Sequence, residues 1–193
     1  MNCLSINIRG VGVNGKADWI RGIKNKEKID FISLQETQCA SINETIIRKF
    51  WGKAKLGWEG VDPTGRSGGL ICMWDTGIFN KIGGYKDSNY LIVKGNIKGY
   101  NESIWLAKIY APQKLRDKKR LWERLTEIRN NEGGIWLLMG DFNSVRIPEE
   151  RKGSVFNPNC GRAFNEFIHN ANLEEYEMKG NRSQSTNVDG ERL

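Results

Sequence analysis

The feature that most constrains the fold is an apolar run that leads into polar residues, Ile135-Trp136-Leu137-Leu138-Met139 followed by Gly140-Asp141-Phe142-Asn143. Five apolar residues in a row predict a strand buried on both faces, which Gly140 then ends. In open α/β sheets, ligand sites form beyond the carboxyl ends of strands. Asp141 and Asn143 are therefore candidates for one reacting centre, although Asp and Asn are also common in ordinary turns.

Other predicted strands also end in polar side chains. One strand of alternating apolar residues ends near Asn7, a second apolar stretch leads to Glu36, and a third strand ends at Tyr110. Converging carboxylates without a nearby histidine or cysteine suit a hard cation such as Mg²⁺ or Mn²⁺, which polarises phosphoryl oxygens. Each residue by itself also fits a plainer role, a solvated strand end for Glu36 and a core aromatic for Tyr110.

Composition limits the class of protein. A chain of 193 residues fits one domain, and its 30 Lys and Arg against 23 Asp and Glu favour a polyanionic partner such as nucleic acid. A basic protein without such a partner would have the same composition. No apolar run approaches the roughly 20 residues that span a membrane, and the first residues do not resemble a secretory signal. The four widely spaced cysteines predict reduced thiols in an intracellular protein.

The periodicity of apolar residues predicts the remaining elements. Helices are expected at residues 16–28, 42–50, 114–131 and 162–171, and further strands at 53–59, 70–74, 78–85, 90–97 and 103–110. In the first helix, Trp19 should face inward with Ile20. Ser41 and Glu44 fit a capping box at the start of the second helix. The first half of the third helix is strongly basic, which fits a solvated face or a DNA contact.

Several of these motifs together resemble the endonuclease/exonuclease/phosphatase superfamily. They are Ser5-Ile6-Asn7-Ile8-Arg9-Gly10, Leu34-Gln35-Glu36-Thr37, Ser67-Gly68-Gly69, Tyr110-Ala111-Pro112 and Gly140-Asp141-Phe142-Asn143. The likeness is greatest to the endonuclease domain of plant LINE-type retrotransposons. It implies an α/β (α+β) fold, a four-layer sandwich of two mixed β-sheets packed face to face and flanked by helices.

The resemblance also implies Mg²⁺-dependent cleavage of phosphodiesters, with a role for each matched residue. Glu36 is expected to bind the metal, with Asn7 beside it, and Tyr110 is expected to steady the phosphate. Asp141 is expected to position the attacking water, and Asn143 to contact the phosphate.

Arg9 and Ser67 are the expected substrate-binding residues. Arg9 stands where apurinic endonucleases carry an acid, which favours the retroelement branch. The family ends in an Asp-bearing strand and a Ser-Asp-His motif that do not occur before Leu193, and His169 is expected on a helix surface instead. We therefore expect residues 1–193 to be one domain that is incomplete at its C-terminus, with its last strands missing, and a weak or inactive enzyme.

These features predict a DNA endonuclease from a retroelement, intracellular and nuclear, with a reverse transcriptase domain downstream and no membrane association. Two alternatives stay open. One is a phosphatase of the same superfamily, since its substrates are also anionic. The other is a non-catalytic remnant that only binds nucleic acid through its basic surface.

Overall fold

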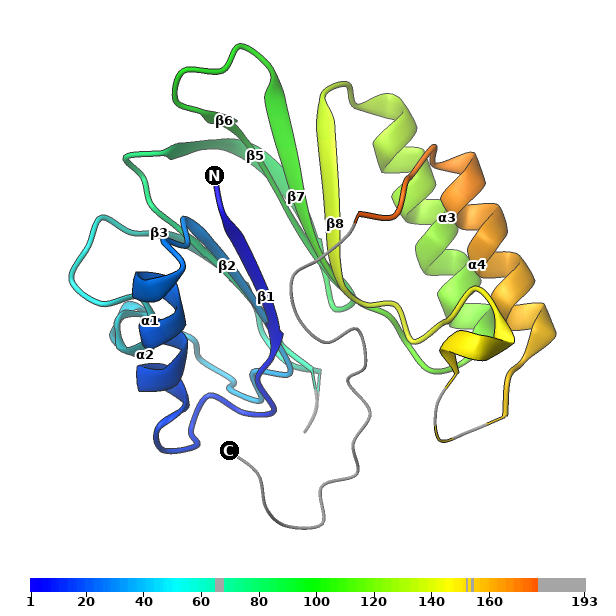
Figure 1. Cartoon of the computed structure of the whole chain (residues 1–193), viewed down its shortest axis with the longest axis horizontal. Coiled ribbons are helices and arrows are strands. Elements are labelled where there is room, and N and C mark those ends of the chain that lie inside the picture. The colour runs from blue at the N-terminus through cyan, green and yellow to red at the C-terminus, as the bar shows by residue number, and fades with distance from the viewer. Residues whose placement is uncertain (65–67, 152, 154, 177–193) are drawn as a thin grey trace. The chain divides into compact units, whose positions relative to one another are not determined.

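The computed structural model describes residues 1–64, 68–151, 153 and 155–176. The chain divides into two compact units (Figure 1). The first combines Met1–Pro112 with Glu132–Phe142, and the second combines Gln113–Asn131 with the segment from Asn143 onward. Within the described residues, no helix is both long and apolar enough to cross a membrane.

The first unit contains two mixed sheets of four strands each. Their strands are β1 (Cys3–Asn7), β2 (Phe31–Gln35), β3 (Gly57–Val61), β4 (Leu70–Trp74), β5 (Phe79–Asp87), β6 (Tyr90–Ile97), β7 (Ser103–Tyr110) and β8 (Ile135–Asp141). The strand orders are β1-β2-β4-β3 and β5-β6-β7-β8. Each sheet has one parallel pair, β1 with β2 and β7 with β8, and its other pairs are antiparallel. Both parallel pairs carry candidate site residues at their carboxyl ends.

Two helices cover the outer face of the first sheet, α1 (Lys16–Lys26) and α2 (Glu44–Trp51). They lie together beside β1 to β3 in Figure 1. Buried Ile20 of α1 and Phe50 of α2 pack in one cluster with apolar residues of β2 and β4, such as Ile32 and Met73. This face of each strand is apolar because every second side chain points to the helices.

The other face of the first sheet packs against the second sheet. The core between them joins residues of β2 and β4 to residues of β5, β6, β7 and β8. Phe31, Trp74 and Phe79 form an aromatic group at its centre, with ring centroids 5.8–6.2 Å apart. The two sheets are therefore packed face to face, and inward-pointing side chains near their strand ends can meet across the interface.

The second unit contains the helices α3 (Leu115–Asn131) and α4 (Pro158–Asn170) and the short 3₁₀ helix η1 (Pro148–Glu150). Trp122 of α3 stacks with Phe167 of α4 at 6.0 Å between ring centroids, which fixes the contact between the helices. Asn157 caps α4 by accepting a hydrogen bond from the backbone N–H of Cys160 at 3.1 Å. His169 is exposed on α4, as predicted.

The predicted α+β class with two mixed sheets and flanking helices is confirmed. The prediction for β8 was wrong in two respects. We predicted a strand buried on both faces. Within the described part of the chain, β8 pairs only with β7, and Ile135 is 52% exposed. The apolar run fits an edge strand equally well because periodicity does not report how many neighbours a strand has. Gly140 also does not end the strand, which continues to Asp141.

Two local predictions were wrong, and a third has one exception. Trp19 is 58% exposed, because α1 buries only Ile20 fully. Asn43, not Ser41, caps α2 by accepting a hydrogen bond from the N–H of Ile46 at 3.1 Å. The basic side chains in the first half of α3 are exposed, as a solvated face requires, except for Lys118, which is buried.

Gly140 provides a test of the fold. Its φ of +139° is unfavourable for other residues, and an added Cβ would lie 2.0 Å from the carbonyl oxygen of Ile109 on β7. We expect Gly140→Ala to lower the free energy of unfolding by at least about 2 kcal/mol in urea titrations. The matched control is Gly133→Ala, where an added Cβ meets nothing within 4 Å. Equal stability of the two variants would contradict this account of β8.

Candidate active site at the strand ends

Asn7 and Glu36 meet at the carboxyl ends of β1 and β2. The parallel register pairs Asn7 with Gln35, and the Asn7 side-chain amide donates to the Glu36 carboxylate at 2.8 Å. Glu36 has a φ of +57°, in the left-handed region. The N–H of Gly10 donates to its carbonyl oxygen at 2.7 Å, which helps to hold this conformation. Such a backbone costs about 1–3 kcal/mol and is common at functional sites.

The two residues after Glu36 are hydrogen-bonded to the loop that contains Gly68 and Gly69. The N–H groups of Thr37 and Gln38 donate to the carbonyl oxygens of Gly69 and Gly68, at 3.3 Å and 3.1 Å. A Cβ on Gly69 would lie 2.1 Å from the Thr37 hydroxyl, so only glycine fits this approach. Ser67, predicted to bind substrate, lies outside the described residues.

Tyr110 and Asp141 meet at the carboxyl ends of β7 and β8. They are register partners, and the N–H of Ala111 donates to the carbonyl oxygen of Asp141 at 2.8 Å. The Tyr110 hydroxyl donates a hydrogen bond to the Glu36 carboxylate of the other sheet. Burial raises the pKa of Tyr110, and the negative charges of Glu36 and Asp141 raise it further. The phenol is therefore a neutral hydrogen-bond donor at physiological pH.

Four of the predicted site residues thus come together in the first unit, namely Asn7, Glu36, Tyr110 and Asp141. Arg9 lies two residues after Asn7 and is exposed, with a φ of +49°. Its backbone N–H donates to the Asn7 side-chain oxygen at 3.2 Å. Its role in binding substrate stays a prediction.

Asn143 belongs to the second unit. Its side-chain oxygen accepts a hydrogen bond from Gln113 at 2.9 Å, and its backbone carbonyl accepts one from the buried Lys118 amine. Its φ is +49°. These contacts fix the conformation of the loop after β8, and the predicted contact of Asn143 with a phosphate stays a prediction.

Sequence reasoning missed Lys108 on β7. Its side chain is 1% exposed, and its amine donates to the hydroxyl of Ser5 on β1 at 2.8 Å. Burial lowers the pKa of Lys108 to about 7, against the opposing effects of Cys72 and Asp141. The signal was present in the strand, because alternation along residues 103–110 places Lys108 on the same inward face as Tyr110.

The donor set can be tested against the predicted divalent metal. Within the described ranges, no three acidic, histidine or cysteine side chains lie close enough together to hold a metal. Mg²⁺ rarely needs such a cage, since one or two carboxylates commonly bind it together with water and substrate phosphate. Glu36, with Asp141 acting on the same Tyr110 hydroxyl, provides hard oxygen ligands of that kind. The residues therefore fit Mg²⁺ or Mn²⁺.

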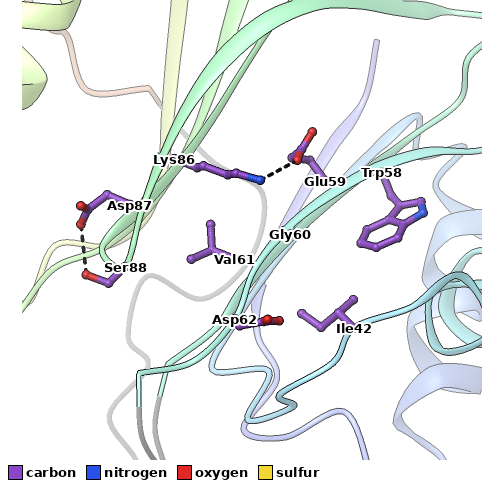
Figure 2. Close-up of a pocket in the computed structure, with 9 residues that line it drawn as sticks. All are labelled: Ile42, Trp58, Glu59, Gly60, Val61, Asp62, Lys86, Asp87 and Ser88. Atoms are coloured by element: carbon purple, nitrogen blue, oxygen red, sulfur yellow. Dashed lines mark hydrogen bonds and ion pairs between the residues drawn. The ribbon is translucent and has the colours of Figure 1, made fainter.

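A separate hollow of about 480 Å³ lies in the first unit between β3 and the turn after β5 (Figure 2). Glu59 on its wall forms ion pairs with Lys86 at 3.2 Å and with Lys81 at 2.5 Å. These two lysines lower the pKa of Glu59 although its partial burial acts to raise it. None of the predicted site residues lines this hollow.

The fold is similar to that of several solved structures. One is the endonuclease domain of TRAS1, a telomere-specific non-LTR retrotransposon, with a TM-score of 0.64 and 13% identity over 88% of this chain and 71% of that one. Another is the AP endonuclease LMAP from Leishmania major, with a TM-score of 0.63 and 14% identity over 88% and 66%. The third is the 3′ phosphatase NExo from Neisseria bound to a product DNA hairpin, with a TM-score of 0.61 and 13% identity over 86% and 70%.

No family model and no curated protein matches the sequence. The structural likenesses show that this chain has the fold of the endonuclease/exonuclease/phosphatase superfamily, as its motifs predicted. A retrotransposon endonuclease domain is among the proteins that share this fold. The chain spans about two thirds of the length of the solved structures that it matches.

The contact between Tyr110 and Glu36 provides a test of the site. Glu36→Gln removes a negative charge and a strong acceptor, so the pKa of Tyr110 should fall toward its ordinary value while the effect of burial remains. The chain has 5 tyrosines, and subtracting the ultraviolet titration of a Tyr110→Phe variant isolates this phenol. Asp141→Asn should cause a smaller fall. An unchanged or higher pKa in Glu36→Gln would show that the two side chains do not meet.

The buried amine of Lys108 predicts how stability depends on pH. Its pKa is lowered from 10.5 to about 7, so between these values the unfolded chain holds a proton that the folded chain has lost. Stability should therefore rise with pH across this window, by up to about 1.4 kcal/mol per pH unit, and be independent of this group below it. Lys108→Met should abolish the rise, as measured by urea unfolding at several pH values. Parallel pH profiles of wild type and variant would contradict the assigned burial.

Proposed function

We propose that this chain is a divalent-metal-dependent phosphodiesterase that acts on DNA, the endonuclease domain of a retroelement. The observation that carries the proposal is the meeting of two pairs at the strand ends. Asn7 and Glu36 lie at the strand ends of one sheet, and Tyr110 and Asp141 lie at the strand ends of the other. The Tyr110 hydroxyl contacts Glu36 across the two sheets. In this fold, these are the residues on which the resemblance to the superfamily rests.

Mg²⁺ or Mn²⁺ would be held by Glu36, with Asn7 as its neighbour. When bound, such an ion neutralises charge that develops on the phosphate. Glu36 accepts hydrogen bonds from Asn7 and Tyr110, so its carboxylate is oriented before any ligand arrives. This orientation matters because preorganised groups need no rearrangement during the reaction.

The other residues supply the chemistry of hydrolysis. The Asp141 carboxylate accepts a proton from a water molecule, whose oxygen forms a bond to phosphorus while the bond from phosphorus to the sugar oxygen breaks. The leaving oxygen takes a proton from solvent. Tyr110, kept neutral by its raised pKa, turns its one O–H from Glu36 to a phosphate oxygen when the substrate binds, and the second N–H of the Asn7 amide is a further donor.

DNA as the substrate is supported by charge. The chain has a net charge of +7. The start of α3 carries exposed basic side chains, Lys114, Arg116, Lys119, Arg120 and Arg124. Phosphate contacts from such side chains supply binding that does not depend on base sequence. The likeness to the TRAS1 domain supports a retroelement origin, from which a reverse transcriptase domain downstream and a nuclear location follow as parts of the same proposal.

The likeness to a 3′ phosphatase favours a second candidate, phosphomonoester hydrolysis at the same site. The same groups serve both reactions, since only the leaving group differs. Plasmid nicking distinguishes the endonuclease, and release of inorganic phosphate from 3′-phosphorylated oligonucleotides or small phosphoesters distinguishes the phosphatase. Salt-sensitive DNA binding with neither reaction would select the non-catalytic alternative.

Nicking of supercoiled plasmid tests the proposed function directly. We expect slow nicking in Mg²⁺ or Mn²⁺ that EDTA abolishes. Asp141→Asn should reduce the rate by about 10²–10⁴-fold, because a positioned proton acceptor contributes a factor of that size. Glu36→Gln should reduce both the rate and the affinity for Mn²⁺.

The matched control is Asp87→Asn, an exposed acid at the end of β5 that belongs to none of the pairs. It should nick at the wild-type rate. Nicking at the wild-type rate by Asp141→Asn would refute the assigned role of Asp141.

A further inference from the structure

Lys108 has a buried amine that the chemistry proposed above does not use. Within the described part of the chain, Ser5 is its one hydrogen-bond partner, and no carboxylate forms an ion pair with it. Burying an amine without a paired carboxylate costs free energy, and an apolar side chain of similar length avoids that cost. Stability alone therefore does not explain a lysine at this position.

The place of the Lys108–Ser5 hydrogen bond is informative. Ser5 precedes Asn7 by two residues on β1, and Lys108 precedes Tyr110 by two residues on β7. Side chains two residues apart on a strand point to the same face, so both partners lie one pleat below the site residues of their strands. The hydrogen bond thus crosses from one sheet to the other directly beneath the contact between Tyr110 and Glu36.

The charged and titratable groups around Lys108 come from two further strands. Cys72 faces it from β4, and burial raises the pKa of that thiol, which keeps the thiol neutral. Asp141 acts on it from β8. Ser5, from β1, carries no charge. Asp141 is therefore the carboxylate whose negative charge acts on the Lys108 amine, without forming an ion pair with it.

We propose that Lys108 is a positioning residue of the candidate active site. Its hydrogen bond to Ser5 holds β7 against β1, and so keeps Tyr110 of one sheet in contact with Glu36 of the other. The consequence for catalysis rests on the proposed function, but the effect on the contact between Tyr110 and Glu36 does not. Breaking the Lys108–Ser5 hydrogen bond should therefore be visible in Tyr110 even without any substrate.

The experiment compares three variants with wild type. Ser5→Ala removes the acceptor and keeps the buried amine of Lys108, whereas Lys108→Met removes that amine. Ser33→Ala is the matched control, because Ser33 is the register partner of Ser5 on β2 and its hydroxyl donates to the Leu4 carbonyl at 3.4 Å instead of contacting Lys108. Ser33 is fully buried and Ser5 is half-buried, so the control removes a hydroxyl that is at least as enclosed. The readouts are the Tyr110 titration, the urea midpoint at pH 7 and the nicking rate.

Ser5→Ala should lower the pKa of Tyr110 toward its ordinary value, and Ser33→Ala should leave it unchanged. Lys108→Met should have a urea midpoint no lower than wild type and yet nick at least about 10-fold more slowly, since small misplacements of catalytic groups are costly. A residue with a purely structural role would lower the midpoint and the rate together.

Two results would overturn the proposal. One is a Tyr110 titration that stays at the wild-type position in Ser5→Ala, and the other is an equal shift in Ser33→Ala. If the wild-type chain nicks no DNA with either metal, the proposed function fails, and the titration of Tyr110 still decides whether the Lys108–Ser5 hydrogen bond positions the site.

Discussion

The candidate site depends on one constraint, the face-to-face packing of two sheets that each end in a parallel strand pair. The β1–β2 pair brings Asn7 beside Glu36, and the β7–β8 pair brings Tyr110 beside Asp141. The proposed hydrolysis of a phosphodiester uses groups from both pairs. The aromatic group of Phe31, Trp74 and Phe79 between the sheets fixes the spacing that lets the two pairs meet.

The site also concentrates features that ordinary core packing avoids. Glu36 has a left-handed backbone, and Lys108 buries an amine beside a hydroxyl instead of a carboxylate. The side-chain nitrogen of Gln35 and the hydroxyl of Thr37 are buried without a hydrogen-bond partner in the described part of the chain. Local violations of this kind are expected where function outweighs stability, and their position around Glu36 agrees with the assignment of the site.

Much of this arrangement could be predicted from sequence, and the limits have physical causes. Polar residues at the ends of apolar strands identified Asn7, Glu36, Tyr110 and Asp141, because strand ends follow from local periodicity. The partners of a strand do not, so β8 was wrongly predicted to be buried on both faces. Lys108 was missed because only its packing distinguishes a buried lysine from a solvated one, and the roles of Ser67 and Asn143 stay predictions.

The most direct test of the account is whether a metal binds beside Tyr110 and Glu36. Addition of Mn²⁺ to protein with ¹³C-labelled tyrosine rings should broaden the Tyr110 signals first, since paramagnetic broadening falls steeply with distance. Tyr100 is an internal control, 70% exposed and beyond the other end of β7, a strand of 8 residues that spans about 27 Å. The account predicts selective broadening of Tyr110 that disappears in Glu36→Gln. Equal broadening of Tyr100 and Tyr110, or broadening of Tyr110 that persists in Glu36→Gln, would contradict it.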